Sequence, residues 1–222
     1  MLARISNRLG LLFGDMNALL HGCPIKPFGA VFCNPNKINR STKFFQIREQ
    51  RYLLNNEDMD RTLIKNKLIQ FIASGDWDEY CVNLEENGII QRAYAHFVAK
   101  KTWDEVGEIE WLQNNIIAHG EQDSCITRED IDKRLLALDE LFAELAAGKK
   151  LILQKYHQKR AFRERGGICV AIDRNGELIW MGDGAHRLAM AKILEIKKIP
   201  IAIILVHSEA LKNNIYKKNI EY

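Results

Sequence analysis

The chain has 222 residues, of which 47% are hydrophobic, and it carries 32 Lys and Arg against 29 Asp and Glu. This length and composition are typical of one globular domain with a real hydrophobic core. They exclude a disordered chain, a collagen-like repeat and a coiled-coil rod. The net charge of +3 is smaller than the basic excess of most dedicated DNA-binding proteins. Nucleic acid therefore stays an open but not a favoured partner.

The distribution of apolar residues and cysteines predicts a cytoplasmic protein. No apolar run approaches the roughly 18 residues of a membrane-spanning helix, so we expect no membrane span. Residues 1–22 are expected to form an amphipathic helix rather than a secretion signal, because Asp15 interrupts the apolar run and no small-residue cleavage site follows. The five cysteines include no CxxC pair, which argues against a disulfide framework and a structural zinc site.

The chain divides into three regions, and the first, residues 1–60, combines the amphipathic N-terminus with a segment rich in proline and asparagine. This segment predicts turns and extended chain rather than helix. Residues 28–33 are expected to form a short strand, and residues 34–38 a turn after it. We assign these residues to the first part of a sheet domain.

The second region, residues 61–148, is expected to be a helical insertion. Apolar residues recur at helical spacing from Leu63 to Ile72, where Gly75 ends the element, and again in residues 88–101. Residues 102–105 have the pattern of a capping box and predict a helix that begins there. Thr127 is expected to cap a further helix, which ends before Gly148. These apolar stripes are interpreted as core.

The third region, residues 149–222, changes from helical to mixed patterning. Its basic segment, residues 149–165, is either a solvated helix face or a surface for an anionic partner. After it the sequence predicts a strand, an Asn175-Gly176 hairpin turn, a second strand, a glycine turn, a helix and a last strand. The fold class is therefore α+β: a small mixed sheet, formed by both ends of the chain, with the helical insertion between them.

The glycine turn and the helix after it, Gly182-Asp183-Gly184-Ala185-His186-Arg187, carry most of the functional signal. The glycines allow a tight turn, and the N-terminus of the following helix favours an anion. Arg187 in the first helical turn opposes the helix dipole unless a phosphate lies there and accepts its hydrogen bonds. The structural alternative is that Asp183 caps the helix and His186 packs beneath it.

At these residues the sequence resembles the ParB/sulfiredoxin superfamily, in which a strand ends in a DGxHR-like box followed by a helix and an "IPV" strand. The resemblance covers residues 168–206, with a weaker match at residues 34–38. Sulfiredoxins have a catalytic cysteine where this chain has Ala185, so sulfinic acid reduction by that route is excluded. Chromosome-partitioning ParB proteins have a helix-turn-helix after the fold, and the residues after Val206 are too few for one. The box is most similar to that of the ParB-related small-molecule kinases, with Ala185 in place of a histidine.

This resemblance implies a nucleotide-binding phosphotransferase that uses ATP or another nucleotide together with Mg²⁺, and that acts on a hydroxyl of a small-molecule or sugar-like acceptor. Gly182, Gly184 and Ala185 would cradle the phosphates, and His186 and Arg187 would contact their oxygens. Asp183 would position Mg²⁺ or act as the base on the acceptor hydroxyl. The kinases also use a glutamate from elsewhere in the chain, for which the candidates are Glu49, Glu57 and Glu177.

Other residues are weaker candidates for the same cleft. Tyr156, Gln158 and Lys159 precede the strand at residues 168–173, and His207 ends the last strand, so all four could contact substrate. Residues 75–78 place two carboxylates around a tryptophan, a pattern that suits a metal or sugar site or an ordinary turn. The rival functions are a ParB-like nucleotide hydrolase or nuclease, and a non-catalytic nucleotide- or DNA-binding module.

Overall fold

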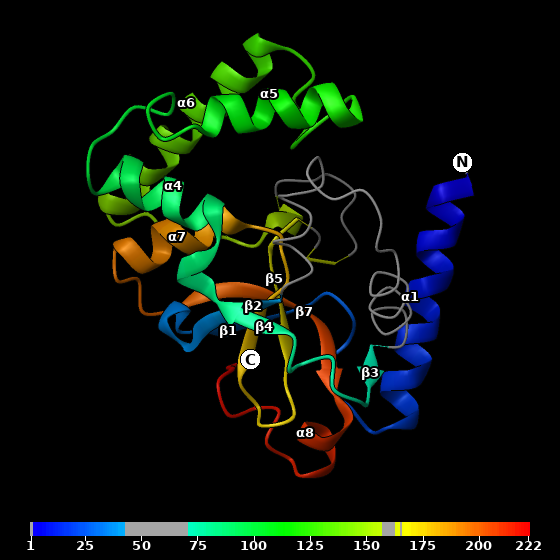
Figure 1. Ribbon diagram of the computed structural model, residues 1–222. Coiled ribbons are helices and arrows are strands. Elements are labelled where there is room, and N and C mark those ends of the chain that lie inside the picture. The colour runs from blue at the N-terminus through cyan, green and yellow to red at the C-terminus, as the bar shows by residue number, and fades with distance from the viewer. Residues whose placement is uncertain (1, 43–70, 157–162, 165) are drawn as a thin grey trace.

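The computed structural model describes residues 2–42, 71–156, 163–164 and 166–222 (Figure 1). It is a mixed α+β fold, as the sequence predicts. In the described part of the chain the helices are α1 (Leu2–Leu20), α4 (Gly88–Phe97), α5 (Glu108–His119), α6 (Arg128–Ala146), α7 (Ala185–Ile193) and α8 (Ser208–Lys212). The strands are β1 (Gly29–Cys33), β2 (Ile38–Thr42), β3 (Ile72–Ala73), β4 (Cys81–Asn83), β5 (Ile168–Ile172), β6 (Leu178–Trp180) and β7 (Ile199–His207).

These strands form one mixed sheet in the order β1-β7-β5-β6-β2-β4, and β3 also pairs with β7. The longest strand, β7, is parallel to β5 and β3 and antiparallel to β1. All nine of its residues are buried, which is the pattern expected of a strand covered on both faces. The hairpin predicted at Asn175-Gly176 joins the antiparallel strands β5 and β6.

Both ends of the chain contribute to this sheet, as predicted, but the middle region contributes to it as well. β3 and β4 come from residues 61–148, so this region is not purely a helical insertion; its helical part begins at Gly88. β4 pairs with the edge of β2, and β3 extends the pairing of β7 beyond the end of β1. The predicted helix that would end near Ile72 lies mostly outside the described residues, and Ile72 itself belongs to a strand rather than to a helix.

Alternate side chains of the central strands pack on opposite faces of the sheet. On β5, Ile168, Val170 and Ile172 belong to the larger core cluster, whereas Cys169 and Ala171 belong to a smaller one. The larger cluster includes side chains of α4, α5, α6 and α7, so these helices pack over one face of the sheet. Figure 1 shows α4 and α7 side by side near the sheet, with α5 and α6 farther from it.

The capping box at residues 102–105 forms, but it closes a turn and does not begin a helix. The backbone N–H of Thr102 donates to Glu105, and that of Glu105 donates back to the Thr102 hydroxyl. The chain then turns through Gly107, which has a φ of 75°, and α5 begins only at Glu108. The second predicted cap is confirmed, because Thr127 and Asp130 form a capping box at the start of α6.

The sequence predicts no membrane-spanning helix, and the described helices can be compared with that expectation. None of them combines the length and the apolar character that a membrane crossing requires.

Candidate functional site

The turn between β6 and α7 has a conformation that requires glycine. Gly182 and Gly184 have φ angles of 101° and 76°, in a region that side chains rarely adopt. A Cβ on Gly184 would lie 2.9 Å from the Cα of Ile168, so the turn packs directly against the start of β5. The carbonyl oxygen of Asp183 accepts hydrogen bonds from the Trp180 indole (2.8 Å) and from the backbone N–H of Cys169 (3.3 Å). The sheet therefore holds the turn in place.

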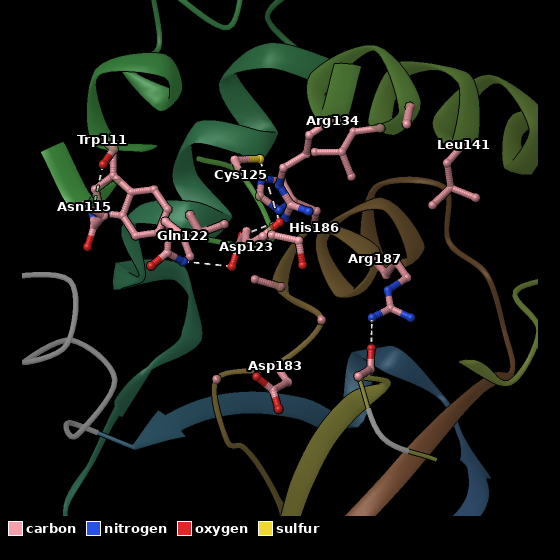
Figure 2. Close-up of a pocket in the computed structure, with 18 of the residues that line it drawn as sticks. Trp111, Asn115, Gln122, Asp123, Cys125, Arg134, Leu141, Asp183, His186 and Arg187 are labelled. Atoms are coloured by element: carbon pink, nitrogen blue, oxygen red, sulfur yellow. Dashed lines mark hydrogen bonds and ion pairs between the residues drawn. The ribbon is translucent and has the colours of Figure 1, made fainter. Parts of the chain in front are cut away.

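Helix α7 begins directly after this turn and has no side-chain cap. Its N-cap residue is Gly184, which offers no side-chain acceptor to the first N–H groups. These groups border a pocket of about 780 Å³, which all six residues from Gly182 to Arg187 line. The structure thus brings the predicted phosphate-binding residues together at one cavity (Figure 2).

The other wall of the pocket comes from the helical part of the middle region, to which the sequence assigned no role in the site. The start of α4, helices α5 and α6 and the loop between them contribute lining residues, among them Asn87, Trp111, Asn115, Asp123, Arg134 and Leu141. In the loop, Asp123 and Ser124 have positive φ angles of 54° and 64°. Arg134 of α6 holds the loop through a 2.7 Å ion pair with Asp123.

His186 contacts a buried carboxylate that sequence reasoning missed. Its Nε2 lies 3.2 Å from Oε1 of Glu108, the first residue of α5. The other carboxylate oxygen of Glu108 accepts a 2.5 Å hydrogen bond from Nε of Arg92 on α4. Glu108 is fully buried, and His186 is 5% exposed. His186 is therefore not simply packed beneath α7: it faces a charged group from the helical wall of the pocket.

Glu108 is ionised despite its burial. Burial alone would raise the pKa of its carboxyl group, but His186 and Arg92 outweigh this effect and lower the pKa from 4.5 to about 2. The N-terminus of α5 also favours a negative charge at this position. The only local signal in the sequence was a glycine followed by a glutamate, which is common in proteins, and this is why Glu108 was not among the candidates Glu49, Glu57 and Glu177.

Arg187 places a partly buried cation on the pocket wall. One N–H of its guanidinium donates to the carbonyl oxygen of Gly166. Burial lowers the pKa of Arg187 from its ordinary value, and Glu164, Cys169 and Asp183 act in the opposite direction. An arginine nevertheless stays protonated at neutral pH, so this desolvated cation favours an anion in the pocket.

Asp183 is exposed at the pocket floor, as its predicted role requires. Its Oδ2 lies 3.6 Å from Sγ of Cys169. Burial and the charge of Asp183 raise the pKa of Cys169, which is thus a neutral core thiol. No cluster of three metal-binding side chains occurs among the described residues. A single carboxylate still fits Mg²⁺, which proteins often bind through one or two carboxylates together with substrate phosphates.

Two of the four predicted substrate residues lie away from the pocket lining. His207 is buried, its Nε2 lies 2.9 Å from the carbonyl oxygen of Gly75, and its Nδ1 accepts from the backbone N–H of Glu209. These contacts give it a structural role at the end of β7. Tyr156 is 71% exposed and is not among the lining residues, whereas its neighbour Gln154 is. Gln158 and Lys159 lie outside the described residues.

The remaining candidates of the sequence analysis have structural partners or fall outside the described part. Glu177 pairs with Lys218 beside the hairpin turn, and Glu49 and Glu57 are not described. In the segment 75–78, burial opposes ionisation of Asp78, but hydrogen bonds from Arg174 outweigh it and lower the pKa of this carboxyl. From the basic segment, Arg163 pairs with Asp15 at 2.5 Å and its side chain is only 10% exposed.

Comparisons with known proteins identify no relative of this chain. No protein-family model, curated protein or solved structure matches the chain. The resemblance to the ParB/sulfiredoxin superfamily therefore stays a prediction. The site is defined by the glycine turn, the uncapped N-terminus of α7, the two cations Arg187 and Arg134, and the Glu108–His186 contact, all at one pocket or directly behind it.

Proposed function

We propose that the protein is a nucleotide-dependent phosphotransferase that transfers a phosphoryl group to a hydroxyl of a small-molecule or sugar-like acceptor. The observation that carries this proposal is the pocket of about 780 Å³, on which an uncapped helix N-terminus, Arg187 and His186 converge. A pocket of this size suits a small ligand or cofactor. The proposal keeps the ParB/sulfiredoxin-like fold and its kinase branch as an expectation.

The phosphates would lie against the turn and the first turn of α7. Free N–H groups at a helix N-terminus bind phosphate, and the helix dipole adds a favourable field. Gly184 lets the turn pack against β5 and has no side-chain acceptor, so the first N–H groups of α7 remain available to a phosphate. Arg187 supplies a cation already shielded from water, so its attraction to a phosphate oxygen is stronger than that of an exposed arginine.

His186 and Glu108 would act as a pair. The ionised carboxylate lies 3.2 Å from Nε2 of the imidazole and would fix the orientation of the ring. An N–H of His186 would then donate to an oxygen of the transferring phosphoryl group, on which negative charge grows in the transition state. Glu108 is a positioning residue in this scheme, because it is fully buried and does not line the pocket.

Asp183 would serve the acceptor. The acceptor oxygen attacks the terminal phosphorus, its proton passes to the Asp183 carboxylate, and the shortened nucleotide leaves. Alternatively, Asp183 would hold Mg²⁺ together with the phosphates, and the ion would neutralise part of their charge. The exposure of this carboxylate at the pocket floor supports the role, since a base must reach the hydroxyl it deprotonates.

The test is turnover of ATP with Mg²⁺, followed by ³¹P NMR, with and without a mixture of serine, glycerol and monosaccharides. We expect a phosphate monoester signal only when an acceptor is present. Asp183→Asn should lower turnover by roughly 100-fold or more while nucleotide binding persists. Asp132→Asn, on the exposed face of α6, is the matched control. Hydrolysis of ATP at the same rate with and without an acceptor would instead indicate a hydrolase.

A further inference from the structure

Two buried hydrogen-bond donors on the pocket lining have no acceptor among the described residues. The first is Nδ2 of Asn87, a residue that is 1% exposed. The Oδ1 atom of the same side chain accepts from the backbone N–H groups of Ile89 (3.1 Å) and Ile90 (3.3 Å), and so caps α4. Because the cap fixes which side of the amide is the oxygen, the free group is the NH₂.

The second donor is the indole N–H of Trp111 on α5. The chain has four tryptophans, and the other three indoles all donate: Trp77 to Ala73, Trp103 to Asp139 and Trp180 to Asp183. Trp111 is only partly buried as a residue, but its Nε1 atom is buried and has no acceptor among the described residues. The guanidinium of Arg92 lies 4.9 Å from the centre of the Trp111 ring, so one face of the indole is already covered.

Such donors are rare in native proteins, because a buried group that loses its water without gaining a partner costs free energy. Both residues line the same pocket as the turn and α7. In Figure 2, Trp111 and Arg187 lie at opposite sides of the view, with His186 between them. Trp111 thus lies at the end of the pocket away from Arg187, and Asn87 is a second lining residue with a free neutral donor.

We propose that Asn87 and Trp111 form a subsite, here named the amide–indole subsite, that binds the carbonyl or carboxylate oxygens of a ligand in this pocket while a nucleotide phosphate lies at α7. This inference rests on the proposed function and specifies its ligand. The oxygens come either from the base of the nucleotide or from the acceptor molecule. In both cases the ligand presents oxygen acceptors, and not hydrogen-bond donors, to Asn87 and Trp111.

Two substitutions remove the donors while they preserve the packing. Trp111→Phe keeps an aromatic ring beneath Arg92 but has no N–H. Asn87→Asp keeps the oxygen that caps α4, since aspartate is as good an N-cap as asparagine, and replaces the NH₂ by an acceptor. Asn83→Asp is the matched control, because Asn83 accepts from the backbone N–H of Glu85 in the same way but does not line the pocket.

The experiment titrates the full-length ¹⁵N-labelled protein with ATP, GTP, CTP and UTP in the presence of Mg²⁺, and separately with serine, glycerate and ribose. The indole N–H signal of Trp111 is identified by its loss in Trp111→Phe. We expect one group of probes to shift this signal, and each donor variant to weaken the affinity for that group about tenfold. The control variant should bind like the wild type.

The outcomes separate the two sources and the two proposals. A shift of the Trp111 signal that depends on the base assigns the oxygens to the nucleotide. A shift with serine or glycerate assigns them to the carboxylate of the acceptor. In that second case Asn87→Asp weakens binding more than Trp111→Phe, because the new aspartate repels the ligand carboxylate. If nucleotides bind but Trp111 does not respond, the subsite is wrong and the phosphotransferase stands. If only the small probes shift Trp111, the subsite stands without the nucleotide. If no probe shifts it, the subsite is overturned.

Discussion

Nε2 of His186 on α7 lies 3.2 Å from Oε1 of Glu108 on α5, which joins the glycine-turn motif to the helical wall of the pocket. Neither atom has a hydrogen-bond partner with good geometry among the described residues, although both are buried. The contact is therefore a close approach of the imidazole to an ionised carboxylate, without the alignment of a good hydrogen bond. It makes the helical part of the middle region part of the candidate site and not merely an insertion beside it.

Glu108→Gln should weaken the pH dependence of stability in acid. The folded-state pKa of Glu108, about 2, lies below its ordinary value of 4.5, so the folded state gains stability from this group above pH 4.5 and loses it as the pH falls toward 2. Glutamine keeps the shape but cannot ionise. Urea unfolding between pH 2 and 6 should give a flatter stability profile for the variant than for the wild type.

Glu110→Gln is the matched control for this measurement, because Glu110 lies in the same first turn of α5 but is exposed. It should reproduce the wild-type profile. A Glu108→Gln profile with the wild-type slope would mean that the carboxylate is not held ionised by Arg92 and His186.

Gly184→Ala should destabilise the protein by more than about 2 kcal/mol, because it combines a strained φ with a clash. The added methyl group would lie 2.9 Å from the backbone of Ile168. Gly120→Ala, at the C-terminus of α5, separates the two effects: its φ of 80° is similar, but nothing lies within 4 Å of the added carbon. We expect this variant to lose only about 1 kcal/mol. Equal losses in chemical denaturation would show that the close approach to β5 is not a constraint.

Arg174→Ala should lower stability without changing ligand affinity. The Arg174 side chain donates to both carboxylate oxygens of Asp78, which is 3% exposed. Its loss would leave this buried charge with only the backbone N–H of residue 174, at a cost of about 2 kcal/mol. Denaturation and calorimetric ligand titration together check this. A loss of affinity with unchanged stability would restore the segment 75–78 as a binding site.

The sequence was most informative where local chemistry alone sets the structure. The hairpin at Asn175-Gly176, the cap at Thr127 and the order of elements from β5 to β7 are all confirmed, because glycine conformations and side-chain caps depend on neighbours in the chain. The six residues from Gly182 to Arg187 line one pocket, which follows in large part from their being consecutive, and their roles stay a prediction.

Tertiary contacts explain what the sequence could not predict. The capping box at Thr102 forms, yet helix α5 begins at Glu108, because the left-handed Gly107 lies between them. Ile72 pairs with β7 although its neighbours show helical spacing. The packing of α5 brings Trp111 to the pocket and Glu108 to His186 behind it. His207 instead contacts the carbonyl oxygen of Gly75, away from the pocket lining. No local pattern records such long-range contacts.

The central claim, a phosphate cradle at α7, is tested most directly by thermal unfolding with ATP, ADP, CTP or GTP and Mg²⁺, on the wild type and Arg187→Ala. Arg128→Ala, an exposed arginine of α6, is the control. A nucleotide at about fifty times its Kd should add roughly 2 kcal/mol to the wild type and to the control, visible as a raised Tm. Arg187→Ala should lose most of this gain. An unchanged wild-type Tm with every nucleotide would contradict the phosphotransferase account.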